Sequence, residues 1–327
     1  PQEADALTWR KNTVAVVSDG SAVLGLGNIG PAAALPVMEG KCAIFKRFAD
    51  INAVPIVLNT QNVEELVTTI SALEPSFGAI QLEDISAPRC FEIEQRLQEK
   101  LNIPVMHDDQ HGTAIVTLAG LLNALKVVGK KLEEVRVVMN GAGAAGVAIA
   151  KLLQKAGMRS FAAVDRSGVI YPGREGLNQE KQWLAGMSTN IHSGQTLVDV
   201  VRGADVLIGV SAAGAFTAEM VRTMNQGSII FALANPVPEI LPDVAREAGV
   251  AVLGTGRSDF PNQVNNALCY PGLFRGMLDH DINQVTDEIK LRAAHAIANF
   301  VKQPTPEKIM PTMFEKGLHE AVANSVV

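Results

Sequence analysis

Short runs of apolar or β-branched residues alternate with longer segments of helical periodicity along the first half of the chain. The short runs predict β-strands at residues 14–17, 42–45, 55–58, 78–81 and 103–106. The longer segments predict helices at residues 63–73, 90–100 and 113–128. Because strands that alternate with helices form parallel sheets through crossover connections, the pattern predicts an α/β architecture.

A polar segment at residues 129–134 opens a second series of the same kind. Its predicted strands lie at residues 135–140, 161–165, 205–210, 229–234 and 250–254. After about Pro261 the strands stop, and the pattern predicts helices at residues 286–296 and 306–323. We therefore expect a parallel α/β domain over residues 1–129, a second α/β domain over 130–264, and a helical segment over 265–327 that packs back on the first domain.

Composition narrows the possible partners of this chain. Hydrophobic residues make up 47% and charged residues 19%, as in folded proteins. A net charge of -6 offers no basic face for phosphate backbones, so we expect no nucleic-acid partner. No run of about 18 apolar residues is present, so we expect no membrane span. The 3 cysteines lack CxxC spacing, which favours a reducing compartment and a cytoplasmic location.

A glycine motif, Gly-Ala-Gly-Ala-Ala-Gly at residues 141–146, directly follows a predicted strand and leads into an alanine-rich helix. Gly141, Gly143 and Gly146 allow a tight turn in which backbone amides approach a pyrophosphate at the helix N-terminus. Asp165 ends the next predicted strand, where an acid can bind the adenosine ribose of a dinucleotide. The context predicts a Rossmann-type site for NAD or NADP.

The choice between the two coenzymes stays open. Asp165 favours NAD, because its carboxylate can accept hydrogen bonds from the ribose hydroxyls. Arg166 follows immediately and could meet the 2′-phosphate of NADP, or could be a solvated residue at the strand end.

A second copy of the glycine motif, Gly-Leu-Gly-Asn-Ile-Gly at residues 25–30, has a different setting. Residues 18–24, with an Asp-Gly-Ser turn, separate it from the preceding strand. We expect a loop that shapes the substrate cleft rather than a second dinucleotide site.

Two acidic pairs follow predicted strands of the first domain, Glu83 with Asp84 and Asp108 with Asp109. The carboxyl ends of parallel strands open on the same edge of a sheet, where ligands of α/β proteins bind. Carboxylates gathered there repel unless a cation lies among them, and oxygen ligands suit Mg²⁺ or Mn²⁺. Exposed turn acids or helix N-caps are the alternative interpretation.

Three other side chains lie near these acids in the sequence or in the predicted sheet. His107 and His111 flank the second pair, but without an HExxH motif or a cysteine partner they favour structural or supporting roles over zinc binding. Lys41 directly precedes the predicted strand at residues 42–45, and a lysine near carboxylates can have its proton affinity tuned for acid–base chemistry.

Read together, these motifs resemble the malic enzyme family, in particular its small prokaryotic members, from Asn12 to the end of the chain. The most specific of them are His-Asp-Asp-Gln-His-Gly-Thr at residues 107–113 and Gly-Arg-Ser-Asp-Phe-Pro-Asn-Gln-Val-Asn-Asn at 256–266. Others lie at residues 14–30, 38–41 (Met-Glu-Gly-Lys), 81–85 (Gln-Leu-Glu-Asp-Ile), 140–146 and 234–236 (Ala-Asn-Pro).

The resemblance implies a role for each matched residue, and it implies metal-dependent oxidative decarboxylation of (S)-malate to pyruvate and CO₂ with NAD or NADP, by a homodimer. Residues 1–129 would be the malic domain that binds substrate and metal. The implied metal ligands are Glu83, Asp84 and Asp109. Lys41 would be the general base with Asp108 as its acidic companion. Asn235 and Asn266 would line the malate and nicotinamide site, and the pyrophosphate loop would comprise Gly141, Gly143, Ala145 and Gly146.

Two positions depart from the family pattern. The family's general acid is a tyrosine in a Tyr-Ser/Thr-Pro-Gly-Val-Ala motif, which this sequence lacks, so we expect that tyrosine upstream of Pro1. Of the 2 tyrosines present, Tyr270 aligns with a different family segment. Large eukaryotic members carry an arginine where Ala22 stands, so the malate carboxylates must be held by other groups.

Two other functions remain to be distinguished. Malolactic enzyme uses similar residues but retains NADH and releases lactate. A catalytically silent dinucleotide-binding module would need no metal site, which the acidic set and Lys41 argue against.

Overall fold

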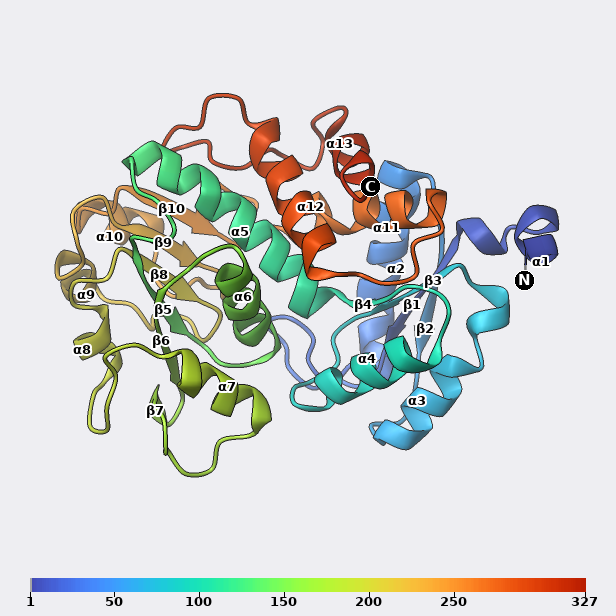
Figure 1. Cartoon of the computed structure of the whole chain (residues 1–327), viewed down its shortest axis with the longest axis horizontal. Helices are drawn as coiled ribbons and strands as arrows, with labels where there is room; N and C mark the ends of the chain where they lie inside the picture. The colour runs from blue at the N-terminus through green and yellow to red at the C-terminus, as the bar shows by residue number, and fades with distance from the viewer. Residues whose placement is uncertain (1) are drawn as a thin grey trace. The chain divides into compact units, whose positions relative to one another are not determined.

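A computed structural model describes residues 2–327 of the chain (Figure 1). The chain folds into two compact units. The first comprises Pro1–Gly112, Asn266–Ala296 and Met313–Val327, and the second comprises Thr113–Asn265 and Ile297–Thr312. Helices α5 (Asp108–Val128) and α12 (Asp287–Phe300) each begin in the first unit and continue into the second.

The first unit is built on a parallel four-stranded sheet of order β2-β1-β3-β4. All six residues of the strand β1 are buried, as expected for an interior strand of a parallel sheet. The strands are β1 (Thr13–Ser18), β2 (Asn52–Val57), β3 (Ala79–Leu82) and β4 (Val105–His107). The helices are α1 (Gln2–Leu7), α2 (Pro31–Ala49), α3 (Val63–Ser71), α4 (Arg89–Lys100), α11 (Tyr270–Asp279) and α13 (Leu318–Asn324).

Helices from both ends of the sequence meet in this first unit. α2 packs along β1 and β2, and α11 packs on both α2 and α13. The parallel N-terminal sheet and the return of C-terminal helices to it confirm those parts of the predicted fold. The stretch Ile297–Thr312, by contrast, belongs to the second unit.

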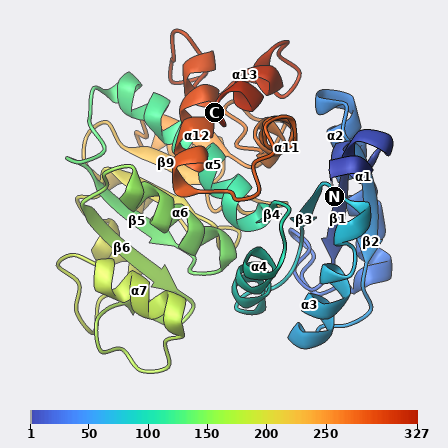
Figure 2. The same ribbon diagram turned by 45° about the vertical axis from the view of Figure 1, so that its right-hand side comes forward.

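The second unit contains a six-stranded sheet of order β10-β9-β8-β5-β6-β7. Figure 2 shows β5 and β6 side by side with α6 close to them. All strand pairs are parallel except β6 with β7. The strands are β5 (Arg136–Asn140), β6 (Ser160–Asp165), β7 (Gly168–Ile170), β8 (Val206–Gly209), β9 (Ile229–Ala232) and β10 (Val252–Thr255). The helices are α6 (Ala144–Lys155), α7 (Gln179–Met187), α8 (Leu197–Val201), α9 (Ala218–Arg222) and α10 (Pro242–Glu247).

The second sheet has the topology of a dinucleotide-binding fold. β5 is flanked by β6 on one side and by β8 on the other, so the strand order reverses direction at β5. Ligands of open α/β sheets bind at such a switch point, beyond the carboxyl ends of the strands. The predicted Rossmann-type architecture is therefore confirmed, with β7 as an additional antiparallel edge strand that makes the sheet mixed.

Three local predictions were wrong. Residues 42–45 lie inside α2 rather than in a strand, because the buried residues Ala34, Met38 and Phe45 follow helical spacing. α5 starts at Asp108 rather than Thr113. In the predicted helix 306–323 only the last part is helical, since prolines and a left-handed glycine, Gly317, precede α13.

One helix, α5, is long and apolar enough by composition to cross a membrane, although the sequence pattern predicted no such segment. Within its most apolar stretch, 67% is buried inside the protein. This burial is typical of the core helix of a soluble protein.

Candidate active site

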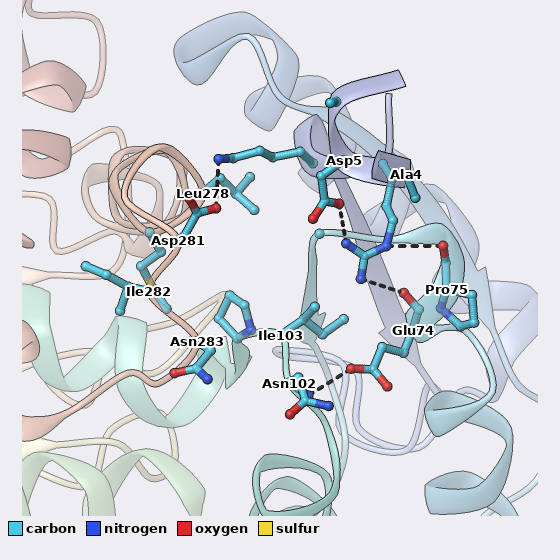
Figure 3. A pocket seen from close by; sticks show the side chains of 16 residues that line it. Ala4, Asp5, Glu74, Pro75, Asn102, Ile103, Leu278, Asp281, Ile282 and Asn283 are labelled. Atoms are coloured by element: carbon cyan, nitrogen blue, oxygen red, sulfur yellow. Dashed lines mark hydrogen bonds and ion pairs between the residues drawn. The ribbon is translucent and has the colours of Figure 1, made fainter. Parts of the chain in front are cut away.

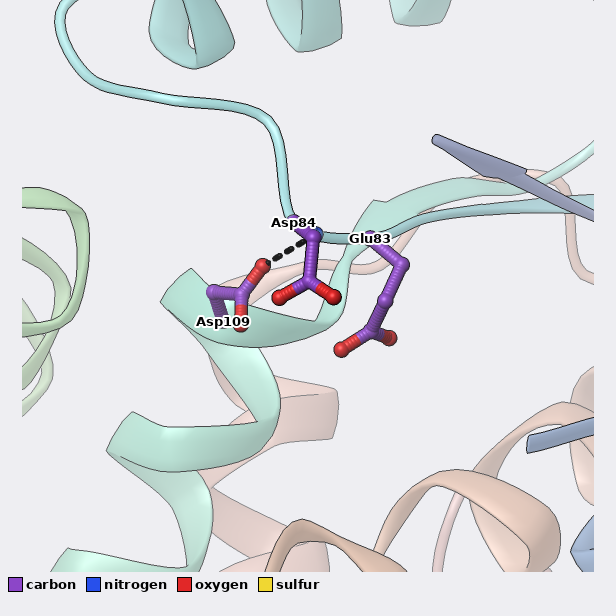
Figure 4. A group of neighbouring side chains, drawn as sticks. All are labelled: Glu83, Asp84 and Asp109. Carbon is purple, nitrogen blue, oxygen red and sulfur yellow. Dashed lines mark hydrogen bonds between the residues drawn. The ribbon is translucent and has the colours of Figure 1, made fainter. Parts of the chain in front are cut away.

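The three predicted metal ligands come together at the carboxyl edge of the first sheet. Glu83 and Asp84 directly follow β3, while Asp109 lies in the first turn of α5, immediately after β4. One carboxylate oxygen from each lies within 4.8 Å of the others (Figure 4). The backbone amide of Asp84 also donates a hydrogen bond to Asp109 Oδ2 at 2.8 Å. Because β3 and β4 are neighbouring parallel strands, both acidic segments leave the sheet at the same edge.

Because this cluster is largely withdrawn from solvent, ionising its neighbouring carboxylates is unfavourable. Glu83 is 3% exposed and Asp84 2% exposed, and two like charges about 4 Å apart repel by about 4 kcal/mol at an effective dielectric constant near 20. Burial and the neighbouring Asp109 raise the pKa of Asp84 to about 7. Burial, followed by the nearby aspartates, raises the pKa of Glu83 well above its usual range.

A divalent cation fits these three residues. Asp84 Oδ2 is buried and has no hydrogen-bond partner. Carboxylate oxygens are the ligands that Mg²⁺ and Mn²⁺ prefer, and a doubly positive ion would stabilise the ionised carboxylates against the burial and repulsion that raise the two pKa values. Asp109 behaves differently: burial opposes its ionisation, but the nearby His107 and Lys41 and the backbone amide of Asp84 together outweigh burial and lower its pKa.

Lys41 extends its amine into the same cluster from α2. Its Nζ lies 2.6 Å from Asp108 Oδ2 and 3.1 Å from Glu83 Oε1, and 4.7 Å from the centre of the Tyr270 ring. Asn266 Nδ2 donates to Asp108 Oδ2 at 3.1 Å. Burial alone would lower the pKa of Lys41, but the charges of Asp108 and Glu83 outweigh it and raise that pKa well above its ordinary value.

His107 contacts the carboxylate cluster, and Glu94, an acid that the sequence interpretation missed, contacts both His107 and His111. His107 Nε2 lies 3.2 Å from Asp109 Oδ2. The buried Glu94 accepts hydrogen bonds from His107 N at 2.7 Å and Gln110 Nε2 at 3.0 Å, and it forms an ion pair with His111 Nε2 at 2.9 Å. Glu94 stands among the buried residues of α4, and an acid on the apolar face of a helix was the signal that could have found it.

The predicted pyrophosphate loop connects β5 to α6 in the second unit. Gly141 has a φ of 119°, which favours glycine. A Cβ on Gly146 would lie 2.0 Å from the carbonyl oxygen of Gly141, so only glycine permits this approach of helix and strand. Gly143 is the N-cap of α6, Ala145 lies in its first turn, and a Cβ on Gly143 would meet nothing within 4 Å. The first amides of a helix have no acceptor within the helix, and such amides can bind an anion.

Asp165 ends β6, but its carboxylate is already engaged. Arg174 Nη2 reaches Oδ1 at 2.7 Å and Lys181 Nζ reaches Oδ2 at 2.6 Å. Burial opposes ionisation here, but the hydrogen bonds from Lys181 and Arg174 outweigh it and lower the pKa of Asp165. Arg166 is exposed and is not among these partners. The sequence interpretation did not foresee Arg174 and Lys181 beside the predicted ribose acid.

Asn235 lies in the loop after β9, at the carboxyl edge of the second sheet. Its Nδ2 donates to Leu233 O at 3.3 Å, and a Cβ on Gly256 would lie 2.5 Å from that nitrogen. The specific motif at 256–266 therefore begins in contact with Asn235. The loop at residues 25–30 also has the form predicted for it: it connects β1 to α2 without being a strand-to-helix turn of the dinucleotide type.

A separate cavity of about 890 Å³ opens in the first unit (Figure 3). Its lining includes Arg10, Glu74 and Asn102, and none of the predicted site residues borders it. Lys11, at its margin, pairs with Asp281 at 2.7 Å.

A Rossmann-type sheet with a glycine loop, in a chain that also carries a buried lysine–carboxylate cluster, defines an α/β enzyme that uses a dinucleotide. Comparison with known families agrees. The model described as malic enzyme, N-terminal domain, matches residues 3–98, and the model described as malic enzyme, NAD binding domain, matches residues 110–326. The chain belongs to the malic enzyme family.

Several relatives resemble the chain over most of its length. A bifunctional malic/malolactic enzyme of Bacillus subtilis is 55% identical, over 98% of this chain and 78% of that protein. An NADP-dependent malic enzyme of Halomonas elongata is 49% identical, over 95% of this chain and 73% of that protein. The crystal structure of an NAD-dependent malic enzyme from Thermotoga maritima superposes with a TM-score of 0.96 at 49% identity, covering 100% of this chain and 86% of that one.

Proposed function

We propose that Glu83, Asp84 and Asp109 hold the divalent cation of a malic enzyme, Mg²⁺ or Mn²⁺, and that Lys41 and Asp108 handle the proton of the substrate hydroxyl. As a member of its family, the chain catalyses the oxidative decarboxylation of malate with NAD or NADP as oxidant. The observation that carries the residue assignment is the convergence of two buried carboxylates and one half-buried carboxylate with the Lys41 amine in one place.

The first chemical step requires a base at the C2 hydroxyl of malate. Lys41 Nζ would accept the hydroxyl proton, and a dinucleotide held at residues 141–146 would supply the oxidant for C2, so that malate would become oxaloacetate. Glu83, Asp84 and Asp109 would hold the cation, which would supply Lewis-acid stabilisation of the negative charge that develops on oxygen during the reaction. Lys41 can act as a base only when its ammonium form is destabilised, and a double positive charge among the same carboxylates has this effect.

Asp108 and Asn266 orient the base in this scheme. Asp108 Oδ2 fixes the amine at 2.6 Å, and the Asn266 amide donates to the same oxygen at 3.1 Å. Loss of the C4 carboxyl group as CO₂ then leaves the enolate of pyruvate, which is protonated at C3 to give the product.

The coenzyme is assigned to the second unit. We propose that the amides at residues 141–146 bind its pyrophosphate, that Asp165 faces its adenosine ribose, and that Asn235 lines the nicotinamide end. The coenzyme preference stays open between NAD and NADP, because Asp165 suits a ribose hydroxyl, whereas Arg174 and Lys181 offer positive charge to a 2′-phosphate.

One assay tests this function directly. Malate is supplied with NAD or NADP, with and without Mn²⁺, while reduced coenzyme, pyruvate and lactate are measured. We expect pyruvate and reduced coenzyme in equal amounts, and only with metal. Lactate without net reduced coenzyme would favour malolactic activity, a second candidate supported by the bifunctional relative from Bacillus subtilis. Turnover that is independent of metal would contradict the proposed cation site.

We further propose a cytoplasmic homodimer. The cysteines are free thiols, in keeping with a reducing compartment. Leu7 is 83% and Trp9 76% exposed, an apolar surface that a second subunit could cover. Measurement of the mass in solution by light scattering tests the dimer, and a monomer at micromolar concentration would contradict it.

A further inference from the structure

Glu239 is a buried acid that the proposed chemistry does not use. It is 0% exposed and lies in the loop after β9. Its Oε2 accepts a hydrogen bond from Ala234 N at 2.9 Å, and its Oε1 accepts from Ser211 N at 2.8 Å and from Ser211 Oγ at 3.3 Å. The groups that donate to its carboxylate are all neutral: the amides of Ala234 and Ser211 and the hydroxyl of Ser211. Both oxygens are therefore used to hold neutral groups of two different loops.

The fold leaves space for this carboxylate. A Cβ on Gly209, the last residue of β8, would lie 2.5 Å from Glu239 Cδ, so any other residue there would displace the acid. Main-chain bonds join the same loops: Phe216 N donates to Glu239 O at 3.0 Å and Gly214 N donates to Pro238 O at 3.2 Å. Glu239 thus links the loop after β8 to the loop after β9.

The link continues across the switch point of the sheet. Asn140 Nδ2, at the end of β5, donates to Ser211 Oγ at 2.8 Å. The next residue, Gly141, opens the pyrophosphate loop, and a Cβ on it would lie 2.5 Å from Val210 O. On the other side, Ala234 directly precedes Asn235. One carboxylate therefore joins the ends of β5, β8 and β9, where a dinucleotide binds in this topology.

We propose that Glu239 is a positioning residue for the coenzyme: through Ser211 and Ala234 it holds the loops after β8 and β9 at the spacing that the bound dinucleotide requires. The inference rests on the coenzyme site proposed at residues 141–146. A carboxylate suits the task because it accepts hydrogen bonds at both oxygens. Glutamine has nearly the same shape but would direct its NH₂ group at one of the two backbone N–H groups.

The test compares Glu239→Gln with a matched control, Asp205→Asn. Asp205 is also a buried acid that bridges neighbouring strands of the same sheet, accepting from Arg136 N at 2.9 Å. It precedes β8, however, and so lies at the opposite, amino edge of the sheet. Both variants lose a buried carboxylate, but only Glu239→Gln changes the edge where the coenzyme binds.

Coenzyme affinity is measured by calorimetry, and KM and kcat are measured separately. We expect Glu239→Gln to raise the Kd and KM for coenzyme about tenfold, with kcat at saturating coenzyme and the Kd for Mn²⁺ retained. Asp205→Asn should lower the melting temperature without changing the coenzyme Kd. An unchanged Kd in Glu239→Gln, or an equal rise in both variants, would overturn the proposal.

A second variant covers the case in which Glu239→Gln fails to fold. Ser211→Ala removes only the hydroxyl that joins Asn140 to Glu239 and leaves the backbone bond in place. It should raise the coenzyme KM about threefold, which is a smaller effect because only the hydrogen bonds of the hydroxyl are lost. An unchanged KM would overturn the proposal. A wild-type chain that binds neither NAD nor NADP would instead refute the coenzyme site itself.

Discussion

Replacing Asp84 with asparagine should stabilise the metal-free protein and abolish its response to metal. Asp84 has a φ of 54°, a left-handed conformation that asparagine tolerates better than most residues. The side chains have nearly the same size, so the substitution removes charge and little else. In the metal-free state that charge is buried, since Asp84 is 2% exposed, and it is repelled by Asp109.

The size of the expected stabilisation follows from the shift in the pKa of Asp84. Folding raises the pKa of Asp84 from 3.8 to about 7, and each pH unit corresponds to about 1.4 kcal/mol. The folded state therefore binds more protons than the unfolded state between pH 4 and pH 7, so the stability of the metal-free protein falls as pH rises through this window. Above pH 7 the penalty is about 4 kcal/mol, and Asp84→Asn removes it.

Thermal unfolding at pH 8 and pH 4, with and without Mn²⁺, measures this prediction. Without metal at pH 8, Asp84→Asn should melt several degrees above the wild type, at roughly 2 °C per kcal/mol, and the gap should close at pH 4. Mn²⁺ should stabilise only the wild type. Asp50→Asn is the control, because Asp50 has a similar φ of 50° but lies exposed outside the cluster. An Asp84→Asn variant less stable than the wild type without metal at pH 8 would refute the reasoning.

Three further substitutions probe other parts of the molecule. Lys41→Ala should lower kcat by roughly 10²- to 10⁴-fold and leave the Kd for Mn²⁺ no weaker; near-normal kcat would exclude Lys41 as the base. Gly146→Ala should weaken coenzyme binding in calorimetry, because the added methyl meets Gly141 O at 2.0 Å, and unchanged affinity would argue against the proposed loop. Arg89→Met should lower the unfolding free energy by about 3 kcal/mol, measured in urea, because it leaves the buried Asp19 without its partner at 2.9 Å; equal stability would show that this ion pair adds nothing.

Local patterns predicted most of the strands, because buried parallel strands form short apolar runs between turn residues. The same rule failed at residues 42–45, which form one turn of a long helix rather than a strand. Ala34, Met38, Lys41 and Phe45 recur at spacings of four, three and four residues, and this period places Lys41 on the buried side of α2. The structure places Lys41 beside the carboxylates, as the sequence predicted, but its supporting element was misread and its catalytic role stays a prediction.

In the candidate site, too, some residues could be predicted from the sequence and others could not. Glu83, Asp84 and Asp109 could be gathered from sequence, because acids that follow neighbouring parallel strands share an edge. Their metal-binding role, the catalytic roles of Lys41 and Asp108, and the domain boundaries at 129 and 264 stay predictions. Hydrogen-bond and ion-pair partners from distant segments could not be predicted. No local pattern indicates that Glu94 contacts His107, or that Arg174 and Lys181 contact Asp165. Such contacts depend on tertiary packing.

Titration of the protein with Mn²⁺, followed by electron paramagnetic resonance, tests most directly whether the three carboxylates form one metal site. We expect one tightly bound Mn²⁺ per chain, retained in Lys41→Ala and lost in Asp109→Asn, whose side chain stays the same size but gives up its charge. Equal Mn²⁺ binding by the wild type and Asp109→Asn, or no bound Mn²⁺ in either, would contradict the proposed metal site.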